Sequence, residues 1–184
     1  MILLGFDPGS VVLGYGAIQS EDKLAKLLEY GVIRPKLKQE DFNLRLAAIY
    51  EDLTKVVKRV QPDVVSIEKM FYHKNVQTLI KLAEARAIAI LVAAKNKIPI
   101  VEYSPREVKK SITGRGNASK QQVQYFVRNL LNISETPEFY DATDALAIAM
   151  CHHLKGDPIV TTTSKKIKSW GDFIKQNPER LLKH

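Results

Sequence analysis

Four acidic residues stand where a fold of alternating strands and helices would bring their carboxylates together. Asp7 follows a short apolar run at residues 2–6 that predicts a buried strand, and Glu68 follows a second such run at residues 64–67. Asp141 and Asp144 lie three residues apart on a predicted helix, roughly 60° apart around its axis, so they share one face. Ligand sites in open sheets gather at strand ends, and we therefore expect the helix face to meet these two strand ends.

Carboxylates brought this close repel one another and require cations. Two carboxylates about 4 Å apart repel by roughly 4 kcal/mol at an effective dielectric of 20. Four would not stay ionised without counter-ions, and Mg²⁺ or Mn²⁺, which prefer oxygen ligands, are the natural ones. Taken singly, each acid has a plainer interpretation: Asp7 precedes a Pro-Gly turn, Glu68 could be solvated, and Asp141 and Asp144 favour a helix start.

The charge of the chain indicates a polyanionic partner. The 184 residues carry a net charge of +8, which draws a protein to nucleic acid. Residues 95–130 hold eight basic and two acidic groups, whereas residues 131–150 hold four acidic groups and no Lys or Arg. An acidic cluster set between basic stretches suits a site that holds cations near a polyanion, and chance together with an acidic helix start is the alternative.

Apolar periodicity predicts the elements that position these residues. A three-stranded meander is followed by helices and strands in alternation, and Ser104 and Ser119 each begin a capping box at a helix start. This order predicts an α/β fold with a mixed five-stranded sheet flanked by helices. The predicted strands cover residues 2–6, 15–18, 27–33, 64–67 and 98–103, and the predicted helices cover 42–60, 76–95, 140–154 and the segments after the two capping boxes.

Two further features concern assembly and location. The later half of the helix at 76–95, residues 87–94, is apolar all round, and a homodimer interface would cover it. The single cysteine, Cys151, excludes an internal disulfide. The chain shows neither an apolar run of the ~20 residues that span a bilayer nor a secretion signal, so we expect a cytoplasmic protein without a membrane segment.

Several motifs, taken in order, resemble the RuvC family of Holliday junction resolvases over roughly residues 1–154. The opening carries Phe6-Asp7-Pro8-Gly9-Ser10 and then Gly14-Tyr15-Gly16. The second segment carries Ile67-Glu68-Lys69-Met70-Phe71, then Lys74-Asn75 and Lys81-Leu82. The remaining motifs are Lys109-Lys110, Gly114-x-Gly116, Lys120-x-x-Val123-Gln124 and Asp141-Ala142-x-Asp144-Ala145-Leu146-Ala147.

This resemblance implies an RNase H-like fold and a homodimeric, metal-dependent endonuclease. Such enzymes nick two strands of like polarity symmetrically in a four-way DNA junction during recombination and repair, together with the RuvA–RuvB branch-migration complex. We expect residues 1–155 to form the nuclease domain. Residues 156–184 form a basic tail to which we assign no role.

The resemblance also implies roles for individual residues. Asp7, Glu68, Asp141 and Asp144 would hold two Mg²⁺ ions, for which Mn²⁺ would substitute, with Asp7 between them. Lys109 and Lys120 match lysines near the scissile phosphate. The remaining residues expected to contact DNA are an aromatic that wedges against unstacked bases, its neighbour and four basic residues: Phe71, Tyr72, Lys74, Lys81, Lys110 and Arg115.

Three other functions are compatible with parts of the sequence. The Asp-x-Gly opening also occurs in actin-like and sugar-kinase ATPases, but these need two lobes, for which 184 residues are too few. A junction-binding protein without catalysis would keep the basic surface, although retention of all four carboxylates argues against it. A related RNase H-like nuclease with another nucleic-acid substrate would keep the carboxylates; the aromatic pair at 71–72 and the two lysines favour the junction.

Overall fold

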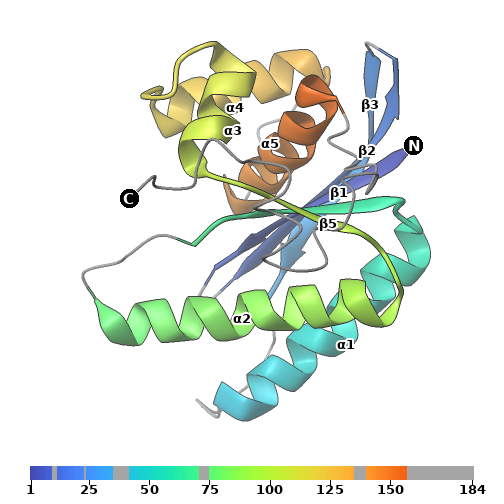
Figure 1. Cartoon of the computed structure of the whole chain (residues 1–184), viewed down its shortest axis with the longest axis vertical. Helices are drawn as coiled ribbons and strands as arrows, with labels where there is room; N and C mark the ends of the chain where they lie inside the picture. Colours follow the sequence, from blue (N-terminus) through green and yellow to red (C-terminus); the bar gives the residue numbers. More distant parts are fainter. Residues whose placement is uncertain (10–11, 23, 35–41, 71–74, 135–139, 157–184) are drawn as a thin grey trace, which may run out of the picture.

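A five-stranded sheet with helices on both faces forms the described part of the chain (Figure 1). The computed structural model describes residues 1–9, 12–22, 24–34, 42–70, 75–134 and 140–156. The strands are β1 (Ile2–Pro8), β2 (Leu13–Glu21), β3 (Leu24–Ile33), β4 (Val64–Glu68) and β5 (Ile100–Tyr103). The helices are α1 (Phe42–Val60), α2 (Val76–Lys95), α3 (Pro105–Thr113), α4 (Lys120–Leu130) and α5 (Tyr140–Lys155).

The strand order is β3-β2-β1-β4-β5, so β1 lies at the centre of the sheet. Strands β1, β2 and β3 pair antiparallel as a meander, whereas β4 pairs parallel to β1 and β5 pairs parallel to β4. The parallel register sets Phe6 opposite Ile67, which brings the ends of β1 and β4 to the same edge of the sheet. The expected mixed five-stranded sheet is confirmed.

Alternation along β1 divides the core between the two faces of the sheet. Leu3 packs into the cluster formed with α3, α4 and α5, while Leu4 and Phe6 pack into the cluster formed with α1 and α2. Figure 1 shows α1 and α2 below the sheet and the other three helices above it. Since side chains alternate, Gly5 and Asp7 face the same side as Leu3, toward α5.

Helix α5 makes the closest contact with the sheet. Its side chains are buried almost throughout, because the sheet lies on one side and α3 and α4 lie on the other. A β-carbon built on Gly5 would stand 2.1 Å from the carbonyl oxygen of Ala145, and one built on Gly14 would stand 2.1 Å from that of Asp141. Glycine at these two positions lets the helix backbone lie directly against β1 and β2.

The predicted elements match the observed ones in type and order, although β2 extends two residues before and three residues after its predicted bounds and β3 begins three residues early. The helices at 42–60 and 76–95 have the predicted bounds, and the capping boxes of Ser104 and Ser119 both form. Strand β5 begins two residues later than predicted, because Lys97 turns the chain at φ 59° and Pro99 has no N–H to give to a ladder. None of the helices in the described ranges is long and apolar enough to cross a membrane.

The close contact of α5 with β1 makes Gly5 intolerant of any side chain. We predict that Gly5→Ala lowers the free energy of unfolding by about 2 kcal/mol or more, because the added methyl group would meet backbone atoms of Ala145 and Ala149 that cannot move independently of the helix. Gly31→Ala is the matched control, since the atoms nearest to its methyl group would belong to the side chain of Tyr15 and not to a backbone. Urea denaturation measures both; an equal loss in the two variants would contradict the account.

Candidate active site

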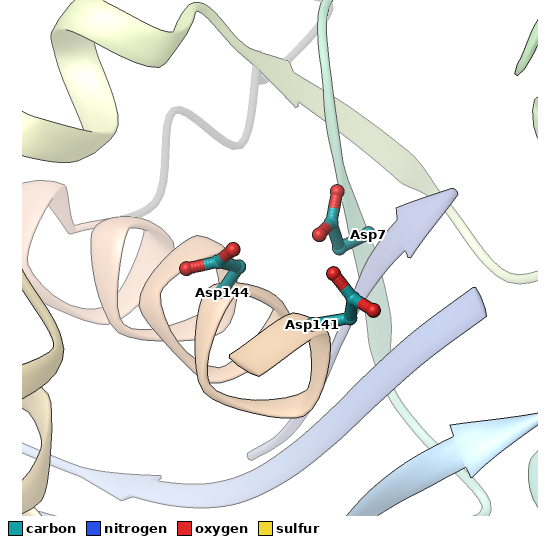
Figure 2. A group of neighbouring side chains, drawn as sticks. All are labelled: Asp7, Asp141 and Asp144. Atoms are coloured by element: carbon teal, nitrogen blue, oxygen red, sulfur yellow. The ribbon is translucent and has the colours of Figure 1, made fainter. Parts of the chain in front are cut away.

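Three of the four acidic residues meet at the end of the central strand. Asp7 lies near the end of β1 and faces α5, whose first turns carry Asp141 and Asp144 (Figure 2). Carboxylate oxygens of these three residues lie within 4.8 Å of one another, and all three side chains are partly buried. Such a group of oxygen donors could hold a metal ion of the Mg²⁺ type.

Glu68 lines a small cavity together with Asp144, one member of this group. It is the last residue of β4, beside β1, and it is near enough to Asp7 for its charge to raise the pKa of that residue. The cavity has a volume of about 290 Å³. Two of the carboxylates and two lysines line it together with apolar side chains. Its lining consists of Glu68, Pro105, Val108, Lys109, Lys120, Val123, Asp144, Ala147 and Ile148.

Burial and the charges of neighbouring carboxylates oppose the ionisation of Asp7, Glu68 and Asp144. Burial and the charges of Asp144, Glu68 and Asp141 raise the pKa of Asp7 from 3.8 to about 8, against the opposing charge of Lys120. Burial and the charge of Asp144 also raise the pKa of Glu68. Burial raises the pKa of Asp144, although a hydrogen bond from Lys120 counteracts it. The site therefore needs further positive charge to hold all its carboxylates ionised.

Lys120 supplies one positive charge by direct contact. It is the first residue of α4, and the capping box of Ser119 and Gln122 fixes where that helix begins. Its Nζ lies 2.5 Å from Oδ2 of Asp144. Burial tends to lower the pKa of Lys120, but the hydrogen bond to Asp144 and the charges of the acidic group outweigh this and raise it, so the side chain is an ammonium.

The other basic residues expected on DNA are distributed over several elements. Lys109 lines the cavity, and its charge lowers the pKa of Glu68. Lys110, its neighbour on α3, lines two hollows away from the acidic group, beside Glu107. Lys81 on α2 and Arg115 between α3 and α4 are exposed. The last three expected contacts, Phe71, Tyr72 and Lys74, lie outside the described residues.

Sequence reasoning missed two features of this site. The Tyr140 ring lies 6.0 Å from Nζ of Lys120 and is mostly exposed, next to Asp141 at the start of α5. Its position immediately before the acidic pair was the available signal. The second feature is the role of Gly5 and Gly14, which the alternation of β1 and β2 could have indicated, because glycine in a strand interior often marks a close approach of backbone.

Fold and site together define the class to which the chain belongs. A mixed five-stranded sheet with helices on both faces and carboxylates at the end of its central strand is the architecture of the RNase H-like nucleases. The family model described as "Crossover junction endodeoxyribonuclease RuvC" matches residues 3–152. The chain therefore belongs to the RuvC family of crossover junction endodeoxyribonucleases.

Individual relatives agree with this assignment. The crossover junction endodeoxyribonuclease RuvC of Chloroherpeton thalassium is 44% identical over 187 residues, which cover 100% of both chains. That of Cytophaga hutchinsonii is 40% identical over 98% of this chain and 88% of its own. Among solved structures, Thermus thermophilus RuvC in complex with a Holliday junction substrate has a TM-score of 0.78 and 30% identity, covering 84% of this chain and 94% of that one.

The raised pKa of Asp7 gives the metal-free protein a distinctive pH dependence. Between about pH 4 and pH 8 the folded chain holds a proton on Asp7 that the unfolded chain releases, so this residue reduces stability progressively as the pH rises. We predict that Asp7→Asn, which cannot ionise, raises the melting temperature in EDTA, and more at about pH 8.5 than at about pH 5. A gain of 1 kcal/mol corresponds to about 2–4 °C in a chain of this size.

Differential scanning fluorimetry at the two pH values measures this gain. Mg²⁺ should raise the melting temperature of the wild-type protein more than that of the variant, which lacks a carboxylate ligand. A variant that melts below the wild type at about pH 8.5 in EDTA would contradict the electrostatic account of Asp7.

Proposed function

We propose that this chain resolves Holliday junctions as a homodimeric, Mg²⁺-dependent endonuclease that nicks two strands of like polarity symmetrically. The observation that carries the proposal is the convergence of Asp7, Asp141 and Asp144 at the end of the central strand, in a chain of the RuvC family. The Thermus thermophilus structure, which is titled as a complex with a Holliday junction substrate, supports the choice of substrate.

Asp7, Asp141, Asp144 and Glu68 fit a pair of divalent ions. All their donor atoms are carboxylate oxygens, and the pKa of about 8 for Asp7 reflects its burial and the negative charge of its neighbours, both of which a bound cation would offset. When bound, two Mg²⁺ ions would clamp the scissile phosphate, activate a water molecule and stabilise the leaving 3′ oxygen. Asp7, at the centre of the acidic residues, would be the least replaceable ligand, and Mn²⁺ would substitute for Mg²⁺.

The lysines of the cavity would receive the phosphate. Lys109 from α3 and Lys120 from α4 line the same cavity as Glu68 and Asp144, and their ammonium groups can neutralise charge that builds up on phosphoryl oxygens. The N-terminus of α4, which Lys120 begins, adds the positive end of a helix dipole. Lys81, Lys110 and Arg115 would contact the duplex arms, while Phe71, Tyr72 and Lys74 would act at the crossover.

An exposed apolar stripe along α2 supports the homodimer. Its residues recur every three or four positions on one side of the helix, and a single chain leaves this face uncovered. Exposed fractions reach 59% for Val76, 51% for Ile80 and 46% for Leu91, and three alanines lie exposed between or beside them. A second copy would bury a helix face of this kind in a symmetric contact. The stripe consists of Val76, Ile80, Ala83, Ala87, Leu91 and Ala94.

The proposal extends to the partners and location that family membership suggests. We include cooperation with the RuvA–RuvB branch-migration complex and a cytoplasmic location, because a four-way DNA junction is the substrate. The division into a nuclease domain at 1–155 and a basic tail at 156–184 is part of the same proposal, and the family model supports it by ending at residue 152.

Cleavage of a synthetic four-way junction tests the function. We predict paired symmetric nicks with Mg²⁺, no nicks in EDTA, and no nicks with Asp7→Asn, which should bind the junction as the wild type does. A linear duplex of the same sequence is the matched substrate control. The variant should cleave the junction at least about 100-fold more slowly than the wild type, because the substitution removes a shared ligand of both ions.

Each alternative function has its own outcome in this assay. Tight binding of the junction without nicks by the wild type would mean a binding protein that lacks catalysis. Equal cutting of the linear duplex would mean a related nuclease with another substrate. Normal cleavage by Asp7→Asn would contradict the proposed metal ligands.

The dimer has a separate test on α2. We predict that Ala87→Glu converts the protein to a monomer at micromolar concentration, because it sets a charge in the middle of the apolar stripe, whereas the wild type has twice the 20.8 kDa of one chain. Gln77→Glu, an exposed substitution on α2 outside the stripe, should leave the dimer intact. Light scattering measures the mass, and a monomeric wild-type protein would contradict the assignment.

A further inference from the structure

The ion pair between Lys120 and Asp144 uses a carboxylate that the proposed function assigns to metal. Nζ of Lys120 lies 2.5 Å from Oδ2 of Asp144, and an oxygen of Asp144 belongs to the group within 4.8 Å that could hold an ion. The Asp144 side chain is mostly buried, at 22% exposed, whereas Lys120 is 51% exposed and can leave. An ammonium in this position neutralises part of the charge that a divalent ion would otherwise neutralise.

We propose that Lys120 is a resident counter-ion of the metal-free site, which a divalent ion must displace from Asp144 on binding. This inference rests on the proposed function, because it assigns the acidic group to metal. A divalent ion and an ammonium repel one another, and a carboxylate that binds the ion has less negative charge left to hold Lys120. The ion and the Lys120–Asp144 pair therefore compete for one carboxylate.

Once a metal ion displaces it from Asp144, the ammonium group of Lys120 can occupy a second position in the cavity. Its side chain lines the cavity that Lys109 and Glu68 also line, so a released ammonium remains beside the place where a phosphate would enter. The backbone of Lys120 does not need to move, because the capping box of Ser119 holds the first turn of α4. Metal binding would thus make the ammonium available to the phosphate, and Lys120 would assist the reaction only after the metal is in place.

Lys109, on α3, provides a matched comparison for Lys120, on α4. It lines the same cavity, and its charge lowers the pKa of Asp144 and of Glu68. Lys120 acts on Asp144 by a hydrogen bond as well as by charge, whereas the influence of Lys109 on Asp144 is that of its charge. Removing either lysine lowers the positive charge of the site equally, but only removal of Lys120 frees the carboxylate.

Binding of Mn²⁺ to the full-length protein without DNA tests the proposal independently of cleavage. Free Mn²⁺ is measured by electron paramagnetic resonance during titration of the wild type, Lys120→Met, Lys109→Met and Lys120→Arg. We expect Lys120→Met to tighten Mn²⁺ binding by up to about fivefold, the upper end of what a partly exposed ion pair contributes. Lys109→Met should tighten binding clearly less, and Lys120→Arg, which keeps the charge and the donor, should lie within about twofold of the wild type.

The outcomes separate the counter-ion from a general effect of charge. Equal tightening in Lys120→Met and Lys109→Met, or no tightening in Lys120→Met, overturns the proposal. Lys120→Gln carries the same prediction as Lys120→Met, so a poorly folded Met variant leaves the test intact. Because no DNA is present, these results are distinguishable from a failure of junction cleavage: a protein that binds Mn²⁺ as expected yet does not cut a junction would overturn the proposed function alone.

Discussion

The contact between the backbone of α5 and two glycines of the sheet is the constraint on which the acidic site depends. A β-carbon at Gly5 or Gly14 would lie 2.1 Å from a carbonyl oxygen of α5, a separation that atoms in proteins do not adopt. Without those side chains the helix lies directly on β1 and β2, and its first turns reach the end of β1. A larger residue would lift Asp141 and Asp144 away from Asp7, so the geometry of the site is set by the packing of the backbone that carries the carboxylates.

The energy that holds the carboxylates together comes from apolar burial elsewhere in the domain. Helix α5 packs on the sheet with one side and on α3 and α4 with the other, and this apolar packing fixes its position. The packing therefore holds the acidic first turns of α5 beside Asp7 although their carboxylates repel that of Asp7. The cost appears as the raised pKa values of Asp7, Glu68 and Asp144. A proton, an ammonium and a divalent ion can each reduce that cost, and the divalent ion is the one with chemistry to perform on a phosphodiester.

Much of this arrangement could be predicted from local sequence. Apolar spacing gave the helices at 42–60 and 76–95, Ser104 and Ser119 gave the starts of α3 and α4, and the strand ends gave the edge where Asp7 and Glu68 lie. The most deeply buried helix is α5, whereas residues 87–94 of α2, for which a covering partner was expected, are partly exposed in the single chain. Periodicity identifies an apolar face but not the element that covers it.

The direct pairing of Lys120 with Asp144 could not be predicted from the sequence, because it depends on how closely the first turn of α4 approaches α5. For the same reason the sequence did not separate Glu68 from the three residues whose carboxylate oxygens lie within 4.8 Å of one another. The roles of Phe71, Tyr72 and Lys74 remain predictions, since these residues lie outside the described part of the chain.

The most direct test of the central claim is anomalous scattering from crystals of the protein grown with saturating Mn²⁺. The claim is that packing of α5 on β1 builds a metal site from Asp7, Asp141 and Asp144. It predicts anomalous peaks in contact with Asp7 and with at least one carboxylate of α5. Crystals in which Mn²⁺ binds elsewhere, while these three carboxylates contact no ion, would contradict it.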